Sequence, residues 1–173
     1  GLWWHDVDAA RNLASVVVQN AALVNRSDRP VTISQVRFDV LRADHAIASH
    51  LLDAQALDAM AQQAAAMQQA GILGALDFQF SLATLLGEGV PLSATRTLAP
   101  DAALLIPSQL LAFAAPAQHI GVTALLEDGT SSTGALPLRG SSAADTFRFP
   151  LAGRWWVAAG ATPHHHHRWV TAQ

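Results

Sequence analysis

Alternation of apolar and polar residues is the feature that most restricts how this chain can fold. In residues 118–127 the even-numbered positions from 120 onward are apolar and fall on one face of an extended strand. Asp128-Gly129 follows directly and is a strong hairpin signal, so residues 132–139 are expected to return as the partner strand. One-sided burial of this kind is typical of an antiparallel sheet rather than a doubly wound parallel one.

A second alternating segment, residues 31–43, contains a change of phase. Its apolar residues lie on odd positions up to Ile33 and on even positions from Val36. A β-bulge near Ser34-Gln35 would produce this one-residue slip. The polar residues that alternate with the even phase are expected to face water; they are Arg37, Asp39 and Arg42.

Residues 14–25 are also expected to form a strand, because β-branched residues dominate their first half. The residue types at positions 25–30 favour a turn after it. One phase of the period-two pattern contains the residues expected to face the core: Val16, Val18, Ala22 and Val24.

Residues 53–71 consist mostly of strong helix formers. Asp53 can cap the start of this helix and Gly71 can end it. We expect its apolar face to pack over an open end or face of the sheet; a partner-binding helix is the alternative. Residues 76–82 alternate like a strand but fit a helix equally well, and we favour a second helix up to residue 86. The apolar face of the first helix contains Leu57, Met60, Ala64 and Met67.

Four prolines divide residues 91–117 into short extended segments, as in the edge strands of a sandwich. Residues 12–139 thus contain six or seven short strands and one helical insertion at about 53–86. The pattern predicts a mainly β fold, an immunoglobulin-like antiparallel β-sandwich with an α-helical insertion. Small polar residues at 140–145 mark a boundary, which gives a sandwich domain at 1–145 and a second segment at 146–173.

Composition excludes several classes of function. The chain has no cysteine, so disulfides, thiolate metal sites and a cysteine nucleophile are ruled out. All ten cationic residues are arginine and the formal net charge is −3, which leaves no basic field to hold nucleic acid. No run of 18 apolar residues is present, so no transmembrane segment is expected, and no signal-peptide-like sequence opens the chain.

Isolated histidines and acidic residues elsewhere in the chain are further candidates for metal ligands or acid–base pairs. His5-Asp6 with Asp8 is more simply interpreted as a frayed polar end of the chain. Asp44-His45 and His50 are more simply solvated loop residues, and His119 is more simply a residue at the edge of a strand.

Four consecutive histidines, His164 to His167, carry the strongest chemical signal. Neutral imidazole binds Zn²⁺ well, but adjacent residues point in different directions, so only one or two of the four could bind one ion. An exposed tract without a role and a tag remnant are the alternatives. We favour one true zinc ligand within the run.

The residues around this run resemble the opening of a bacterial lysostaphin-like zinc metallopeptidase domain, a family of murein endopeptidases. Such domains begin with Pro-Leu-x-Gly-x-Trp and an apolar strand, followed by a glycine turn and a His-His pair. Residues 150–155 match that opening, residues 156–159 the strand and Gly160 the turn. His166-His167 then precede Gln173 at the spacing of the next motif.

The resemblance implies a zinc-dependent hydrolase that cleaves cell-wall (peptidoglycan) peptides, with metal-bound water attacking the carbonyl. In that family a His and an Asp of the first motif and a His of a later His-x-His hold the metal. The first ligand would be His166 or His167, with His165 a third option. The other ligands are not within the 173 residues, so this chain would hold only the first strands of a peptidase domain, and by itself would bind zinc weakly and cut nothing.

Two functions follow as expectations, so the enzyme question is left open. The first is the N-terminal portion of a zinc-dependent cell-wall endopeptidase, in which the sandwich domain positions or regulates the peptidase. The alternative is a stand-alone envelope β-sandwich that binds a partner without catalysis. The expected partners are peptidoglycan peptides or another envelope protein, and the expected location is the bacterial cell envelope, the periplasm or the exterior.

Overall fold

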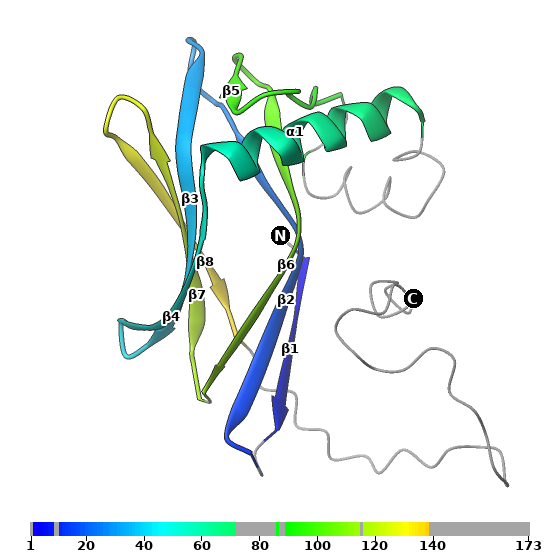
Figure 1. The fold of residues 1–173 in the computed structure, drawn as a ribbon. Helices are drawn as coiled ribbons and strands as arrows, with labels where there is room; N and C mark the ends of the chain where they lie inside the picture. Colours follow the sequence, from blue (N-terminus) through cyan, green and yellow to red (C-terminus); the bar gives the residue numbers. More distant parts are fainter. Residues whose placement is uncertain (1, 9–10, 72–85, 87–88, 115, 139–173) are drawn as a thin grey trace, which may run out of the picture.

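Two antiparallel sheets face each other and a helix lies across one end of them (Figure 1). The computed structural model describes residues 2–8, 11–71, 86, 89–114 and 116–138. One sheet has the order β1-β2-β6 and the other β4-β3-β7-β8, with β5 paired to β3. The elements are β1 (Leu2–Asp8), β2 (Leu13–Val24), β3 (Val31–Arg42), β4 (His45–Leu52), α1 (Ala54–Gln69), β5 (Thr97–Leu98), β6 (Ala103–Ala114), β7 (His119–Leu126) and β8 (Ser131–Pro137).

This arrangement confirms the predicted sandwich with a helical insertion. The two sheets have the strand order of an immunoglobulin-like fold, with the insertion between β4 and β6. The hairpin at Asp128-Gly129 is confirmed as well, because β7 and β8 pair from Leu125↔Ser131 to His119↔Pro137. The positive φ of Gly129, 83°, is one that a residue without Cβ adopts readily.

The predicted β-bulge lies where the phase change placed it. Ile33 pairs with Leu126 and Gln35 with Leu125, so Ser34 is the extra residue of β3. Its hydroxyl donates a hydrogen bond to the carbonyl of Leu125, 2.9 Å away, which fixes the bulge. Both halves of β3 thereby turn apolar side chains inward. The fully buried ones are Ile33, Val36, Phe38 and Val40.

The outer face of β3 is less exposed than its sequence indicates, and the expectation for Asp39 was wrong. Asp39 is buried at 8% exposure, whereas Arg37 is exposed. Because β3 is a central strand, Asp39 has neighbours on both sides, and its carboxylate accepts hydrogen bonds from Arg37 Nε (2.7 Å) and Ser49 Oγ (2.6 Å). Arg42 is half-buried because its guanidinium donates to the carbonyls of Pro116 and Ala114.

The predicted inward phase of β2 holds only for its first half. Val16 and Val18 are fully buried, but further along the strand Ala21 and Leu23 pack against the core. The partner strand β6 changes phase at the same level, near Pro107, which pairs with Asn20. Since residues paired across two strands lie on the same face of the sheet, both strands turn the other set of side chains inward beyond this point.

The helix begins and ends as its sequence predicted. The carboxylate of Asp53 accepts a hydrogen bond from the N–H of Ala56 at 2.9 Å, and Gly71 follows the C-cap with φ of 70°. The buried face is rotated slightly from the expected one, because Met60 and Met67 are only half-buried. The buried residues are Leu57, Ala61, Ala64 and Ala65, and they lie over the end of the sandwich as expected.

Two strands, β1 and β4, were not predicted from the sequence. The segment that includes His5 and Asp8 forms β1 rather than a frayed end, and the segment from His45 to His50 belongs to β4 rather than a loop. The turn before β4 consists of Ala43-Asp44, both with positive φ (45° and 65°). Hairpin turns of this geometry normally use Asn-Gly, so the sequence carried no turn signal.

Proline did not divide residues 103–114 as expected, because β6 continues through Pro107. In the order β1-β2-β6 this strand lies at the edge, where a missing N–H is tolerated. The proposed second helix falls almost wholly on residues 72–85, outside the described residues. The segment 146–173 lies outside them too.

Candidate binding groove

An apolar groove of about 650 Å³ opens between the two sheets, on the side where β2 and β8 face each other. Its walls are the end of β2, the start of β3 and the inner faces of β7 and β8. The charged residue of the lining is Arg26, which forms an exposed ion pair with Asp101 at 3.0 Å. The apolar lining residues are Ala21, Ala22, Leu23, Val24, Val31, Ile33, Leu98, Val122, Ala124, Leu126, Ala135 and Leu136, with Gly134 between them.

The groove lies beyond the last described pair of β1 with β2. Among the described residues, β1 pairs with β2 only from Asp8↔Leu13 to Leu2↔Asn20. The last four residues of β2, 21–24, pair with β6 on one side and have no described strand on the other. β8 is likewise an edge strand in the order β4-β3-β7-β8. The groove therefore lies between two strand edges.

Asn25 holds the rim of the groove at the end of β2. Its side-chain amide donates to the carbonyls of Arg29 (2.8 Å) and Leu98 (3.0 Å), and its Oδ1 accepts from the N–H and hydroxyl of Ser27. Asn25 is buried at 5% exposure, so these bonds form in a partly water-excluded setting where they are stronger than in water. They fix the β2–β3 turn against Leu98, one of the lining residues.

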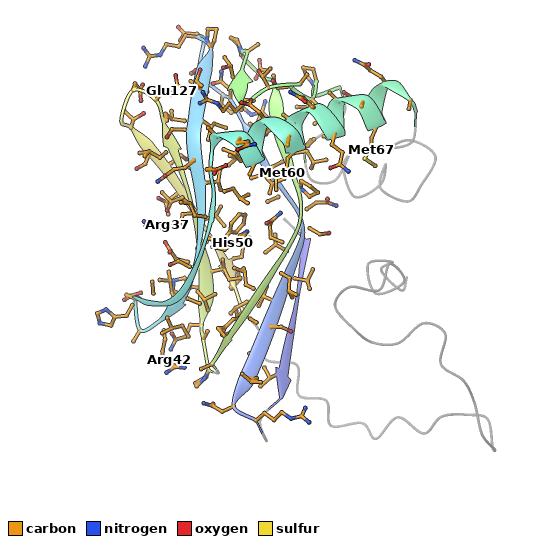
Figure 2. The ribbon with its side chains drawn as sticks, viewed as in Figure 1. Arg37, Arg42, His50, Met60, Met67 and Glu127 are labelled. Carbon is orange, nitrogen blue, oxygen red and sulfur yellow. The ribbon has the colours of Figure 1, made fainter. Side chains whose placement is uncertain are left out.

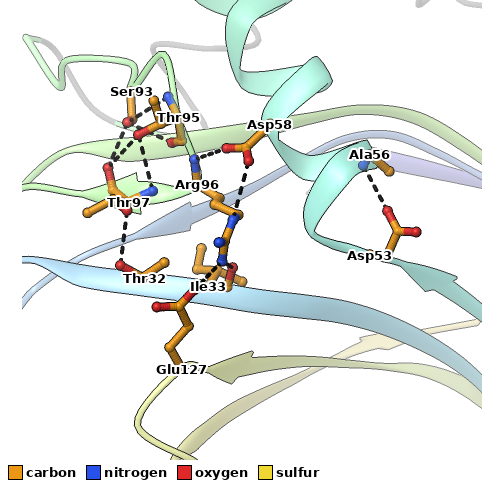
Figure 3. A network of polar contacts seen from close by, with 10 residues as sticks. All are labelled: Thr32, Ile33, Asp53, Ala56, Asp58, Ser93, Thr95, Arg96, Thr97 and Glu127. Carbon is orange, nitrogen blue, oxygen red and sulfur yellow. Dashed lines mark hydrogen bonds and ion pairs between the residues drawn. The ribbon is translucent and has the colours of Figure 1, made fainter.

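Arg96 closes one end of the sandwich by joining three elements (Figure 3). Its Nη1 donates to Glu127 Oε1 at 2.6 Å and to the carbonyl of Ile33 at 3.0 Å, and its Nε lies 3.3 Å from Asp58 Oδ2 of α1. The hydrogen bond to Glu127 is the main cause that raises the pKa of Arg96 above its ordinary value. Ile33 and the adjoining Leu98 are thereby held in place along the groove.

The hairpin beside the groove is fixed by Asp128. Its Oδ1 accepts from the hydroxyl and N–H of Thr130, at 2.6 and 2.9 Å. These two bonds lower the pKa of Asp128 below its ordinary value of 3.8, and the bond from the Thr130 hydroxyl is the larger cause. Arg29, 3.6 Å away, adds a favourable charge and links this hairpin to the β2–β3 turn.

A separate polar pair lies within the sandwich. His50, which the sequence placed in a solvated loop, points inward from β4, and its Nε2 lies 3.0 Å from Oε1 of buried Gln109 on β6 (Figure 2). Gln109 Nε2 donates in turn to the carbonyl of Pro107 at 2.7 Å. The pair bridges the two sheets, and within the part of the chain that the structure describes neither side chain has an acidic hydrogen-bond partner.

The structure does not bring the other sequence candidates together. Within residues 2–8, 11–71, 86, 89–114 and 116–138, no group of three or more His, Cys, Asp or Glu residues could hold a metal ion. Asp44 and His45 lie at the β3–β4 turn, and His119 begins β7. The zinc candidates from the sequence, His165, His166 and His167, fall outside the described residues.

No sequence signal indicated the groove. It depends on how the two sheets pack against each other, and β1 was not expected to be a strand. Its residues are ordinary alanines, valines and leucines, which any sandwich core contains.

Among the described residues, no helix is long and apolar enough to cross a membrane.

Comparisons of the chain with protein-family models, with curated proteins and with solved structures found no significant match. The proposals below therefore rest on the residues and the groove alone.

Proposed function

We propose that this sandwich is a binding module whose apolar groove takes an uncharged ligand. The observation that carries the proposal is the groove itself, about 650 Å³ of space with a mostly apolar lining between the end of β2 and the edge strand β8. Ligand sites in proteins are typically concave, mostly apolar and of several hundred Å³. Filling the groove would remove apolar side chains from water at about 25 cal/mol per Å² of buried surface.

Gly134 offers a direct test, because it lies on β8 opposite Val122, whose side chain packs against the core. A Cβ added at Gly134 meets no heavy atom within 4 Å, so a larger side chain fits there without displacing the backbone. Gly134→Trp should fill the groove. Ser131→Trp is the matched control, because Ser131 lies on the same strand but on its opposite face, is exposed, and does not line the groove.

The uncharged dye Nile red, which fluoresces on apolar surfaces, is a suitable first probe. The wild-type chain should bind it in the groove, Gly134→Trp should weaken binding at least about tenfold, a loss of about 1.4 kcal/mol, and Ser131→Trp should leave it unchanged. Equal binding by all three proteins would show that the dye does not use the groove, and the proposal would then fail.

A second function is supported by the sequence of residues 150–173. Pro150, Gly153 and Trp155 stand at the spacing of the opening of a lysostaphin-like peptidase domain, and His166-His167 at that of its first metal motif. We propose that this segment begins a zinc-dependent peptidoglycan endopeptidase in a bacterial cell envelope, which the sandwich would position or regulate.

Zinc titration calorimetry tests this second proposal. His166→Ala or His167→Ala should weaken zinc binding by about tenfold or more, as expected for loss of a ligand, and His164→Ala should have little effect. Equal weakening by all of these substitutions would indicate an unspecific histidine tract and would remove the support for a peptidase.

A further inference from the structure

We infer that Pro107 and the side chain of Gln109 together prevent β6 from pairing, along its free edge, with the same strand of a second copy of this chain. The free edge is the side of β6 that faces away from β2. The inference is independent of the groove. It gives a role to the hydrogen-bonded pair of His50 and Gln109, which the binding proposal does not use.

The direction of the backbone groups defines the free edge. Among the described strands β6 has one neighbour, β2, and the two keep a single register along the whole of β6. The N–H of Ala103 donates to the carbonyl of Pro91, and its carbonyl accepts from the N–H of Ser93, so both groups point away from β2. Backbone groups point to alternate sides along a strand, so those of every second residue after Ala103 lie on the free edge. These residues include Leu105, Pro107, Gln109 and Leu111.

This edge lacks the charged residues that commonly keep a strand edge from pairing. β6 is 12 residues long, and none of them is Asp, Glu, Lys or Arg. Two copies of the strand placed antiparallel would therefore bring no like charges together. Uncharged, mostly apolar strands pair readily with identical strands of other copies. A second copy is thus the partner that this edge would accept, and the edge needs protection of another kind.

Position 107 cannot take part in a ladder on the free edge. A residue that faces a partner strand exchanges two hydrogen bonds with it, one through its N–H and one through its carbonyl. Pro107 has no N–H, and its carbonyl already accepts a hydrogen bond from Gln109 Nε2 at 2.7 Å. A strand placed on this edge would therefore pair only in short pieces on either side of Pro107, and short isolated pairings are marginally stable.

His50 holds the Gln109 amide in this blocking orientation. A carbonyl oxygen can only accept, so the amide nitrogen of Gln109 faces Pro107 and its amide oxygen faces His50. Nε2 of His50, 3.0 Å from that oxygen, is then the donor. The His50 ring lies near Phe38 in turn, with ring centroids 6.5 Å apart. Because Gln109 is buried at 7% exposure, water competes little for these bonds and the amide stays on the Pro107 carbonyl.

The test uses the full 173-residue chain labelled with ¹⁵N. The double variant Pro107→Val/Gln109→Leu supplies the missing N–H and releases the carbonyl at position 107. Raising its concentration from about 10 to about 500 μM should slow hydrogen exchange of the Leu111 amide at least about tenfold, because this N–H then enters a ladder with a second copy. Its mass by light scattering should rise over the same range. In the wild-type chain, exchange at Leu111 should not depend on concentration.

Two controls separate edge pairing from a general loss of stability. Val18→Ala removes two methyl groups from the position of β2 that pairs with Gln109 and leaves the edge intact. It should lower the Tm without making exchange at Leu111 depend on concentration. Leu110→Lys, added to the double variant, places a charge on an exposed side chain of the same strand and should weaken self-association at least about tenfold.

Concentration-independent exchange at Leu111 in the double variant would overturn the inference. So would equal self-association by the wild-type chain or by Val18→Ala, because the edge would then be open already or unfolding would be the cause. Self-association that persists with Leu110→Lys would count against edge pairing in the same way. If circular dichroism shows that the double variant does not fold, Gln109→Leu alone replaces it. This single variant still releases the Pro107 carbonyl, and exchange at Leu111 should slow at least about threefold over the same concentrations.

Discussion

Leu57 tests whether α1 is part of the hydrophobic core or an appendage to the sandwich. It is fully buried, whereas the other buried residues of the helix are alanines. Leu57→Ala removes three carbon atoms, worth about 2.4 kcal/mol at about 0.8 kcal/mol for each. The cavity left behind adds to this, so the free energy of unfolding should fall by about 3–4 kcal/mol in total.

The assay is urea and thermal unfolding followed by circular dichroism in both the helix and the strand bands. For a domain of this size the loss corresponds to a Tm lower by about 6–16 °C. Met67→Ala is the matched control, because Met67 lies on the same helix but is only half-buried, and it should lower stability by no more than about 1 kcal/mol.

Two results would refute this reasoning. A loss below about 1 kcal/mol for Leu57→Ala would mean that the helix contributes little to the core. Loss of the helix signal at low urea with an unchanged strand transition would mean that α1 unfolds separately from the sheets. Coincident transitions, both shifted, are the expected outcome because the residues of α1 contact β3, β4 and β6.

Three further predictions concern the local structure. Asp53→Ala should lower the free energy of unfolding by about 1 kcal/mol because the N-cap is lost, and Asp53→Ser should restore most of it; equal urea midpoints for all three proteins would contradict the cap. Deletion of Ser34 should destabilise the protein by about 3 kcal/mol in the same assay, because removing the bulge turns buried Ile33 and its neighbours to the other face; a native-like midpoint would argue against the bulge. The pKa of Asp128 is lowered, so its carboxylate stabilises the folded state above pH 3.8 and this contribution is lost as the pH falls through the folded-state pKa. Wild type should therefore lose stability relative to Asp128→Asn below pH 3.8, and parallel pH profiles of the urea midpoint would count against that bond.

The features that the sequence predicted correctly are those controlled by neighbouring residues. The alternation in β7, the Asp128-Gly129 turn and the helix cap at Asp53 each involve contacts within a few positions of the chain. Even the bulge at Ser34 is local, because side chains alternate along a single strand and a phase slip is visible in the residues themselves.

The features that the sequence misjudged depend on distant partners. The sequence predicted that Asp39 faces solvent, but in the fold Ser49 of β4 lies beside it and donates to its carboxylate. The sequence predicted that His50 is a loop residue, but in the fold Gln109 of β6 lies opposite it. Arg96 carries no motif, yet it contacts residues 38 and 31 positions away at Asp58 and Glu127.

The fold could be predicted from the sequence, whereas the candidate groove could not. The sequence by itself determined a mainly β sandwich with an inserted helix, because period-two patterns, turn residues and caps act over a few residues. Only the tertiary structure decided that the end of β2 and the strand β8 face each other across a groove. A groove between strands is set by which edges remain unpaired after the sheets assemble, and no local pattern of residues records that.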